Sequence, residues 1–151
     1  MNQAPQAPEG PSIPFLIAAL DHDEPVMRSN AAKELGRRGE AAAPALEALA
    51  RTLQDPDPMV SALAANAIGK IGQQPDEPTT ARFIEMLAQA PYPIRFWVAD
   101  AVERLALDTE AMRAQLTALA ADPHPMAKAV RAVARRTLKA WGADVPDSPT
   151  T

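Results

Sequence analysis

Apolar and polar residues follow the period of an α-helix along this chain, and the pattern recurs four times. In each recurrence an apolar anchor is followed by apolar or small residues about four, eight and eleven positions later, on one face of a helix. The alternation with period two that is typical of strands is nearly absent. The anchors of the four faces are Met27, Val60, Ile94 and Val130. The pattern predicts an all-α protein.

The recurrence has a nearly constant period. Residues 25–39 and 58–72 align without a gap at an offset of 33, and the next two anchors follow after 34 and 36 residues. A period of this size is typical of helical solenoids, whose repeats bury their apolar faces against one another. Since the last spacing is longer, we expect the last helix to be extended by nearly a turn, with Met126 in its buried stripe.

Each repeat is predicted to contain a first helix, A, and a second helix, B, joined by a Pro-rich turn. Ser12 can cap the first A helix, and Pro44 is expected to open the second. Gly39, Gly72 and Gly142 stand where the end of a helix requires a left-handed residue. The predicted repeats are about 12–39, 43–72, 78–106 and 109–142. They form one domain, 12–142, and we expect disorder in the Pro-rich arm 1–11 and in the tail 143–151.

An acidic, Pro-containing turn followed by Val-Arg-x-x-Ala-Ala-x-x-Leu-Gly resembles the HEAT and HEAT-like (phycobilisome lyase type) repeats. The pattern is present as Met27-Arg28, Ala31-Ala32, Leu35-Gly36 and as Val60-Ser61, Ala64-Ala65, Ile68-Gly69. The ankyrin and tetratricopeptide signatures are missing. The resemblance implies a right-handed α-solenoid of about four helical-hairpin repeats and eight helices, with the B helices lining its concave side. It also implies that Arg28, Arg95 and Arg131 pair with turn aspartates in a structural ladder.

Charge is divided unequally between the two kinds of helix. The predicted B helices carry twelve lysines and arginines against three carboxylates, whereas the rest of the chain carries three against sixteen. The B-helix side is therefore expected to be basic in a chain of net charge −4. Such a surface would steer an acidic partner. Ladder pairing, and basic residues that complement helix C-termini, are the structural alternative.

Helical geometry places rows of residues along the B helices, opposite the buried stripe. Phe96 lies about 200° from Ile94 at 100° per residue, where no core is expected, so it is a candidate contact residue. Trp97 lies at the edge of the stripe. The candidate partner-binding residues are Phe96, Trp97, Lys33, Arg37, Asn66, Lys70, Arg104, Arg135, Arg136 and Lys139.

The sequence offers little for catalysis. His22 and His124 lie in separate turns, cysteine is absent, and no phosphate-binding loop or nucleophile with a base is recognisable. We expect no enzyme activity, no cofactor, no metal and no small-molecule substrate. No apolar run approaches the roughly 18 residues of a membrane span, and the expected location is cytoplasmic, without membrane contact.

The expected function is that of a protein-interaction scaffold or adaptor that binds an acidic or amphipathic segment of another protein on its basic concave face. Two alternatives remain. One is nucleic-acid binding, as in HEAT-like alkylpurine DNA glycosylases, through Arg135, Arg136, Lys139 and Trp97. The other, implied by the resemblance alone, is a bilin lyase-like subunit that acts on a chromophore protein.

Overall fold

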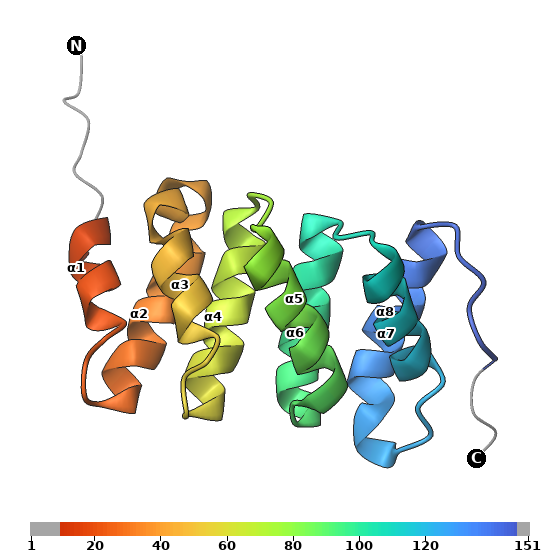
Figure 1. Cartoon of the computed structure of the whole chain (residues 1–151). Helices are drawn as coiled ribbons and strands as arrows, with labels where there is room; N and C mark the ends of the chain where they lie inside the picture. The colour runs from red at the N-terminus through yellow and green to blue at the C-terminus, as the bar shows by residue number, and fades with distance from the viewer. Residues whose placement is uncertain (1–9, 148–151) are drawn as a thin grey trace, which may run out of the picture.

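The computed structural model describes residues 10–147, and this part of the chain is entirely helical apart from turns and the last few residues (Figure 1). The elements are α1 Ile13–Ala19, α2 Pro25–Arg38, a 3-10 segment Gly39–Ala45, α3 Leu46–Thr52, α4 Pro58–Ile71, α5 Glu77–Gln89, α6 Tyr92–Leu105, α7 Glu110–Ala120, a 3-10 segment Pro125–Ala127, and α8 Lys128–Ala140. The described residues contain no strand. The prediction of an all-α protein with four helical hairpins is confirmed.

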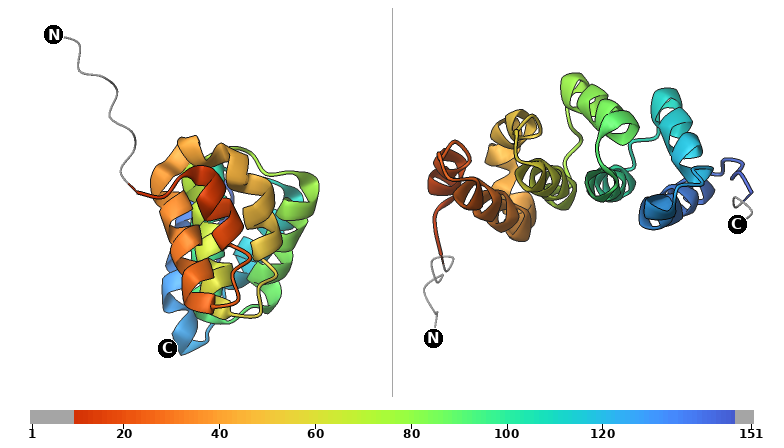
Figure 2. Two further views of the ribbon diagram at one scale, coloured as in Figure 1. Left: turned by 90° about the vertical axis from the view of Figure 1, so that its left-hand side faces the viewer. Right: turned by 90° about the horizontal axis from the view of Figure 1, so that it is seen from below.

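The helices form two layers. The A helices α1, α3, α5 and α7 make one layer, and the B helices α2, α4, α6 and α8 make the other (Figures 1 and 2). Seen from below, the row is gently bowed, with the B helices on its inner side (Figure 2). The chain runs from one end of the row to the other, so each repeat packs mainly against its neighbours, as in a solenoid. No described helix has the length and apolar character needed to cross a membrane.

A continuous apolar core lies between the layers. Its largest fully buried side chains come from successive helices, among them Leu35, Leu49, Ile68, Phe83 and Leu116. These residues occupy the helical faces that the sequence period marks as apolar. At roughly 1.5–3 kcal/mol for each large side chain removed from water, this burial is the main stabilising term.

Glycines allow the first three B helices to pack closely. A Cβ added at Gly36 would lie 3.1 Å from the Cα of Ala67, and one at Gly69 would lie 2.8 Å from the Cα of Ala101. In the third repeat Glu103 follows the buried Val102, where the first two repeats have glycine. The contact between α6 and α8 instead includes an ion pair at the surface, between Glu103 and Arg136.

The residue after each anchor ties its B helix to the preceding turn. Arg28 donates to the carbonyls of His22 and Asp23, both at 2.9 Å, and Ser61 donates to that of Leu53 at 2.9 Å. Arg95 donates to the carbonyl of Ala90, and Arg131 to that of Asp122. Of the three arginines expected to form a ladder, only Arg28 also binds a turn aspartate, Asp55. The ladder prediction is wrong for the other two, because their guanidinium groups bind backbone carbonyls.

The predicted helix ends agree with the structure at most positions. The Ser12 hydroxyl accepts the Phe15 N–H at 3.3 Å, and Gly39, Gly72 and Gly142 have φ of 56°, 80° and 68°. Ala106, which takes the corresponding place in the third repeat, is also left-handed at φ 49°. Pro44 does not open a helix. It lies inside the 3-10 segment, and α3 begins at Leu46.

Two expectations about the last repeat are wrong. Met126 is 63% exposed, because residues 125–127 form a 3-10 turn that turns Ala127 inward instead. Part of the tail expected to be disordered is ordered, since Ala143 and Val145 pack on the core and Arg135 donates to the carbonyl of Pro146. The predictions for residues 1–9 and 148–151 lie outside the described residues.

Candidate interaction surface

The candidate surface is the side of the B helices that points away from the A layer, which we call the B-helix face. Positions 59, 62, 66 and 70 of α4 share one face of the helix because they are separated by three or four residues. This face is opposite the buried Val60, Ala64 and Ile68. The corresponding positions in α2 and α6 are 26, 29, 33, 37 and 93, 96, 100, 104. The last of the four positions is basic in all three helices: Arg37, Lys70 and Arg104.

Six of the ten predicted residues are lysines or arginines that lie on the exposed part of this face. They belong to the second halves of helices, where positive charge also complements the helix dipole. We call this set the basic row; it consists of Lys33, Arg37, Lys70, Arg104, Arg136 and Lys139.

The arginines of the basic row have carboxylate partners. Arg37 binds Glu34 at 2.7 Å, and Arg104 binds Asp100 at 2.7 Å. Arg136 binds Glu103 through two hydrogen bonds of 2.5 and 2.7 Å. In two of these pairs the hydrogen bonds lower the pKa of the carboxylate. The pKa of Glu103 is lowered mainly by Arg136, and that of Glu34 is lowered to about 2 by Arg37 and Arg38.

The lysines of the basic row differ from the arginines. Lys33, Lys70 and Lys139 are exposed, and within residues 10–147 none of them makes an ion pair. Each ammonium group is therefore available to a carboxylate of a partner. The arginines retain open edges on the same face, since the side chains of Arg37, Arg104 and Arg136 are 65%, 50% and 59% exposed.

Two predicted residues do not present a charge or a free polar group to a partner. Arg135 is half-buried, and its guanidinium group binds the ordered part of the tail at Pro146. Asn66 is only 6% exposed. Its Nδ2 is buried and has no acceptor within residues 10–147.

Phe96 and Trp97 lie together near the start of α6. Both rings are half-buried and pack edge to face, with 5.5 Å between centroids. Phe96 lines a groove of about 310 Å³ towards α8, and Trp97 lines both this groove and one of about 280 Å³ towards α4. Each ring thus has one side in the core and one side open to solvent, the position expected of an interface anchor.

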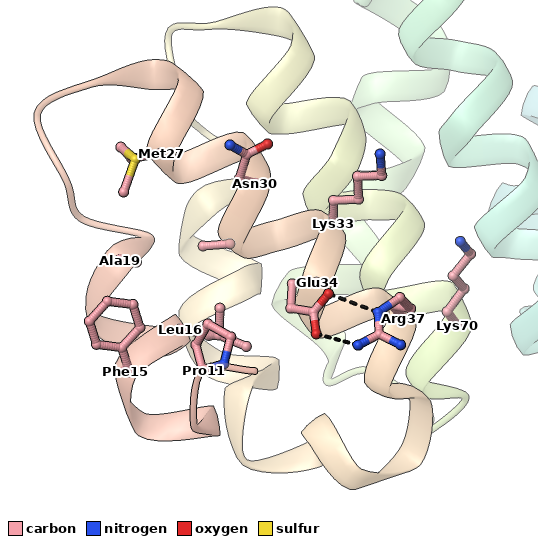
Figure 3. Close-up of a pocket in the computed structure, with 11 residues that line it drawn as sticks. Pro11, Phe15, Leu16, Ala19, Met27, Asn30, Lys33, Glu34, Arg37 and Lys70 are labelled. Carbon is pink, nitrogen blue, oxygen red and sulfur yellow. Dashed lines mark hydrogen bonds and ion pairs between the residues drawn. The ribbon is translucent and has the colours of Figure 1, made fainter. Parts of the chain in front are cut away.

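A larger groove, of about 490 Å³, lies where the B-helix face meets the first end of the row (Figure 3). Phe15 of α1 and Met27 of α2 form its apolar side and are 59% and 41% exposed. Lys33 and Lys70 stand on its other side. Met27 takes the place that the buried Val60 has in the next repeat, but it is exposed and lines this groove.

Three exposed apolar residues of this surface were not predicted from the sequence. Val26, Met59 and Met126 are 65%, 59% and 63% exposed. Each directly follows a proline that begins a B helix or, for Met126, the 3-10 segment before α8; we call these the B segments. This shared position is the signal that could have identified them. Periodicity alone assigns apolar residues to the core, so it does not indicate which of them remain exposed.

Both histidines accept a backbone hydrogen bond within their own turn. The Nδ1 of His22 accepts the N–H of Glu24, and the Nδ1 of His124 accepts the N–H of Met126. His124 also stacks on Tyr92, with 4.9 Å between ring centroids. In the described part of the chain, histidine and carboxylate side chains form no cluster that could hold a metal ion.

Comparison with known families identifies the architecture. The family model for HEAT repeats matches residues 13–103, more than half of the chain. The protein therefore belongs to the HEAT-repeat family, whose members commonly serve as scaffolds for protein interaction and are typically non-catalytic. The match covers the first three hairpins, and α7 and α8 continue the same stacking beyond it. No curated protein matches the chain.

Proposed function

We propose that this protein is a non-catalytic scaffold or adaptor that holds an acidic segment of another protein on its B-helix face. The observation that carries the proposal is the set of three exposed lysines on that face without ion pairs inside the described chain: Lys33, Lys70 and Lys139. The chain as a whole has a net charge of −4. A positive face on a negative molecule attracts and orients an acidic partner, and the attraction weakens as salt rises.

A protein partner suits this face better than nucleic acid. Glu34, Asp100 and Glu103 lie among the cations, where they would repel a phosphate backbone but leave open positions for selected carboxylates. The half-buried rings of Phe96 and Trp97 add apolar contact area, which a protein segment can cover.

The test is affinity capture from extracts of the organism that makes this chain. The triple variant Lys33→Glu, Lys70→Glu, Lys139→Glu is compared with wild type and with Arg51→Glu, an exposed charge reversal on α3. We expect wild type and Arg51→Glu to retain a protein that the triple variant loses. A triple variant that retains the same proteins as wild type would contradict this placement of the site.

The nucleic-acid alternative is tested separately. Duplex DNA titrated into the full chain at low salt should show no binding that depends on Arg136 and Lys139. Binding that these residues control, and that falls steeply as salt rises, would replace the protein partner by nucleic acid.

A further inference from the structure

Each B segment presents an exposed apolar residue at its start. Val26, Met59 and Met126 are 65%, 59% and 63% exposed, and Pro93, at the same place in α6, is also exposed. Successive members are 33, 34 and 33 residues apart, so they recur once in every repeat. We call Val26, Met59, Pro93 and Met126 the apolar row.

Apolar grooves connect the last three members of this row. Met59 and Pro93 line the groove of about 280 Å³ between α4 and α6, and Pro93 and Met126 line that of about 310 Å³ between α6 and α8. Both grooves also include Trp97, so they meet at this ring. The apolar surface thus runs across three B helices without a charged residue among those that line it.

The apolar row lies parallel to the basic row on the same face. In α2, α4 and α6 the two rows are eleven residues apart: Val26 and Arg37, Met59 and Lys70, Pro93 and Arg104. Eleven residues of helix span roughly 16 Å at 1.5 Å per residue. The B-helix face is therefore itself amphipathic, with an apolar edge at the helix starts and a cationic edge near the helix ends.

We infer that the partner segment is an amphipathic α-helix that lies across the B helices, with its apolar side on the apolar row and its carboxylates towards the basic row. The inference rests on the proposed function and makes the partner more specific. The proposed function requires only an acidic partner, whereas this inference requires a definite pattern of apolar and acidic positions on one helix.

The dimensions favour a helix as the occupant. A helix with its side chains is about 10–12 Å across. It therefore fits between the apolar row and the basic row, which are roughly 16 Å apart. Packed helices lie about 8–10 Å apart, and seven residues of a crossing helix rise about 10.5 Å. Apolar residues repeated every seven positions can therefore meet the apolar row at successive B helices.

Two other occupants fit this face less well, one because of its charge and one because it lacks an apolar side. A second copy of this face would bring its own lysines and arginines against the basic row. Nucleic acid would satisfy the cations but leave the exposed methionines without an apolar partner. Methionine suits a surface that accommodates a partner side chain, because its unbranched thioether can adjust its shape.

The experiment uses the full chain and three synthetic peptides of about 21 residues, long enough to span four B helices at 1.5 Å per residue. The first is an amphipathic helix with leucines on one side and glutamates along the adjoining flank. The second has the same composition in scrambled order, and the third replaces the leucines by serine. Binding is followed by the fluorescence anisotropy of a labelled peptide, and Trp97 emission, with Trp97→Phe as control, reports on the groove.

The protein variants separate the two rows. Met59→Glu with Met126→Glu removes the apolar row, and Lys70→Glu with Lys139→Glu reverses the basic row. Met59→Ser with Met126→Ser is a milder second pair, and circular dichroism checks that each variant folds. Ala118→Glu, at an exposed position on α7 in the A layer, is the matched control.

The inference expects the amphipathic peptide to bind at least about tenfold more tightly than the scrambled and serine peptides, and expects each double glutamate variant to weaken it by about tenfold or more. Ala118→Glu should change affinity less than about twofold. Equal binding of all three peptides, or full binding by both methionine variants, would overturn it.

The possible failures can be distinguished from one another. If binding of the acidic peptides depends on the lysines but not on the methionines, the proposed function is supported and the amphipathic helix is rejected. If the captured partner is lost only from the lysine variants, the conclusion is the same. Self-association of the free chain that Met59→Glu abolishes would show a second copy on the row, and would also overturn the inference.

Discussion

Arg28 and Asp55 form a two-hydrogen-bond ion pair that joins the start of α2 to the turn before α4. Nε donates to Oδ2 at 2.7 Å and a terminal nitrogen donates to Oδ1 at 3.0 Å, across 27 residues of sequence. The side chains are only 13% and 8% exposed. Burial alone would raise the pKa of Asp55, but the hydrogen bonds from Arg28 and from the Asp57 N–H outweigh it and lower that pKa. The pair thus links the first two repeats.

Removing the carboxylate should destabilise the chain. We expect Asp55→Ala to lower the free energy of unfolding by roughly 1–3 kcal/mol, because Arg28 loses a charged, partly buried partner. Chemical denaturation followed by circular dichroism measures the change. Glu47→Ala is the control, since its pair with Arg51 is exposed and should contribute less than about 0.5 kcal/mol. Equal effects of the two substitutions would contradict this role for Asp55.

The two close helix contacts should respond differently to an added methyl group. Gly69→Ala places a Cβ 2.8 Å from the Cα and 2.9 Å from the Cβ of Ala101, whereas Gly36→Ala meets Ala67 at 3.1 and 3.3 Å. Overpacking costs about 1–3 kcal/mol, and alanine recovers up to about 1 kcal/mol of helix propensity. We therefore expect Gly69→Ala to be destabilising and Gly36→Ala to be closer to neutral. Thermal unfolding of both variants decides the order, and the reverse order would be evidence against this packing account.

Two buried polar residues of α4 should differ in their contribution to stability. Ser61 donates to the carbonyl of Leu53, so Ser61→Ala is expected to cost about 1 kcal/mol. The Nδ2 of Asn66 has no acceptor in the described part of the chain, so Asn66→Ala is expected to cost less, or to stabilise. Urea denaturation of the two variants under the same conditions gives the comparison. A larger loss from Asn66→Ala would mean that this side chain has a stabilising contact.

Stability should depend on pH through Glu34. Its pKa is lowered from 4.5 to about 2 by the hydrogen bonds of Arg37 and Arg38. A depressed pKa contributes stability that is fully present above about pH 4.5 and is lost as the pH falls towards 2. We expect Glu34→Gln to reduce the fall in unfolding free energy between pH 5 and the lowest pH at which the chain still folds. Denaturation at several pH values measures it, with Glu47→Gln as the exposed control, and identical slopes for wild type and Glu34→Gln would rule the effect out.

Phe96 offers a test of the binding surface apart from charge. We expect Phe96→Ala to weaken the complex with the partner by on the order of 1–2 kcal/mol, because the ring is a half-buried anchor beside Trp97. The loss of packing against Trp97 also lowers stability, so binding is measured where circular dichroism shows the variant folded. Unchanged affinity in the folded variant would remove Phe96 from the site.

The helical repeat and its core could be predicted from the sequence because each depends on local spacing. The period of Met27, Val60 and Ile94, the caps at Ser12 and Gly72, and the enrichment of cations in the B helices are all visible in the chain. The tertiary structure decided what those residues contact. It paired Arg136 with Glu103, turned Arg135 towards Pro146, and bound Arg95 and Arg131 to backbone carbonyls. It also left Met59 and Met126 in solvent beside Trp97. Periodicity defines the direction of a side chain on its own helix, whereas its partner and its exposure depend on the neighbouring helices that pack around it.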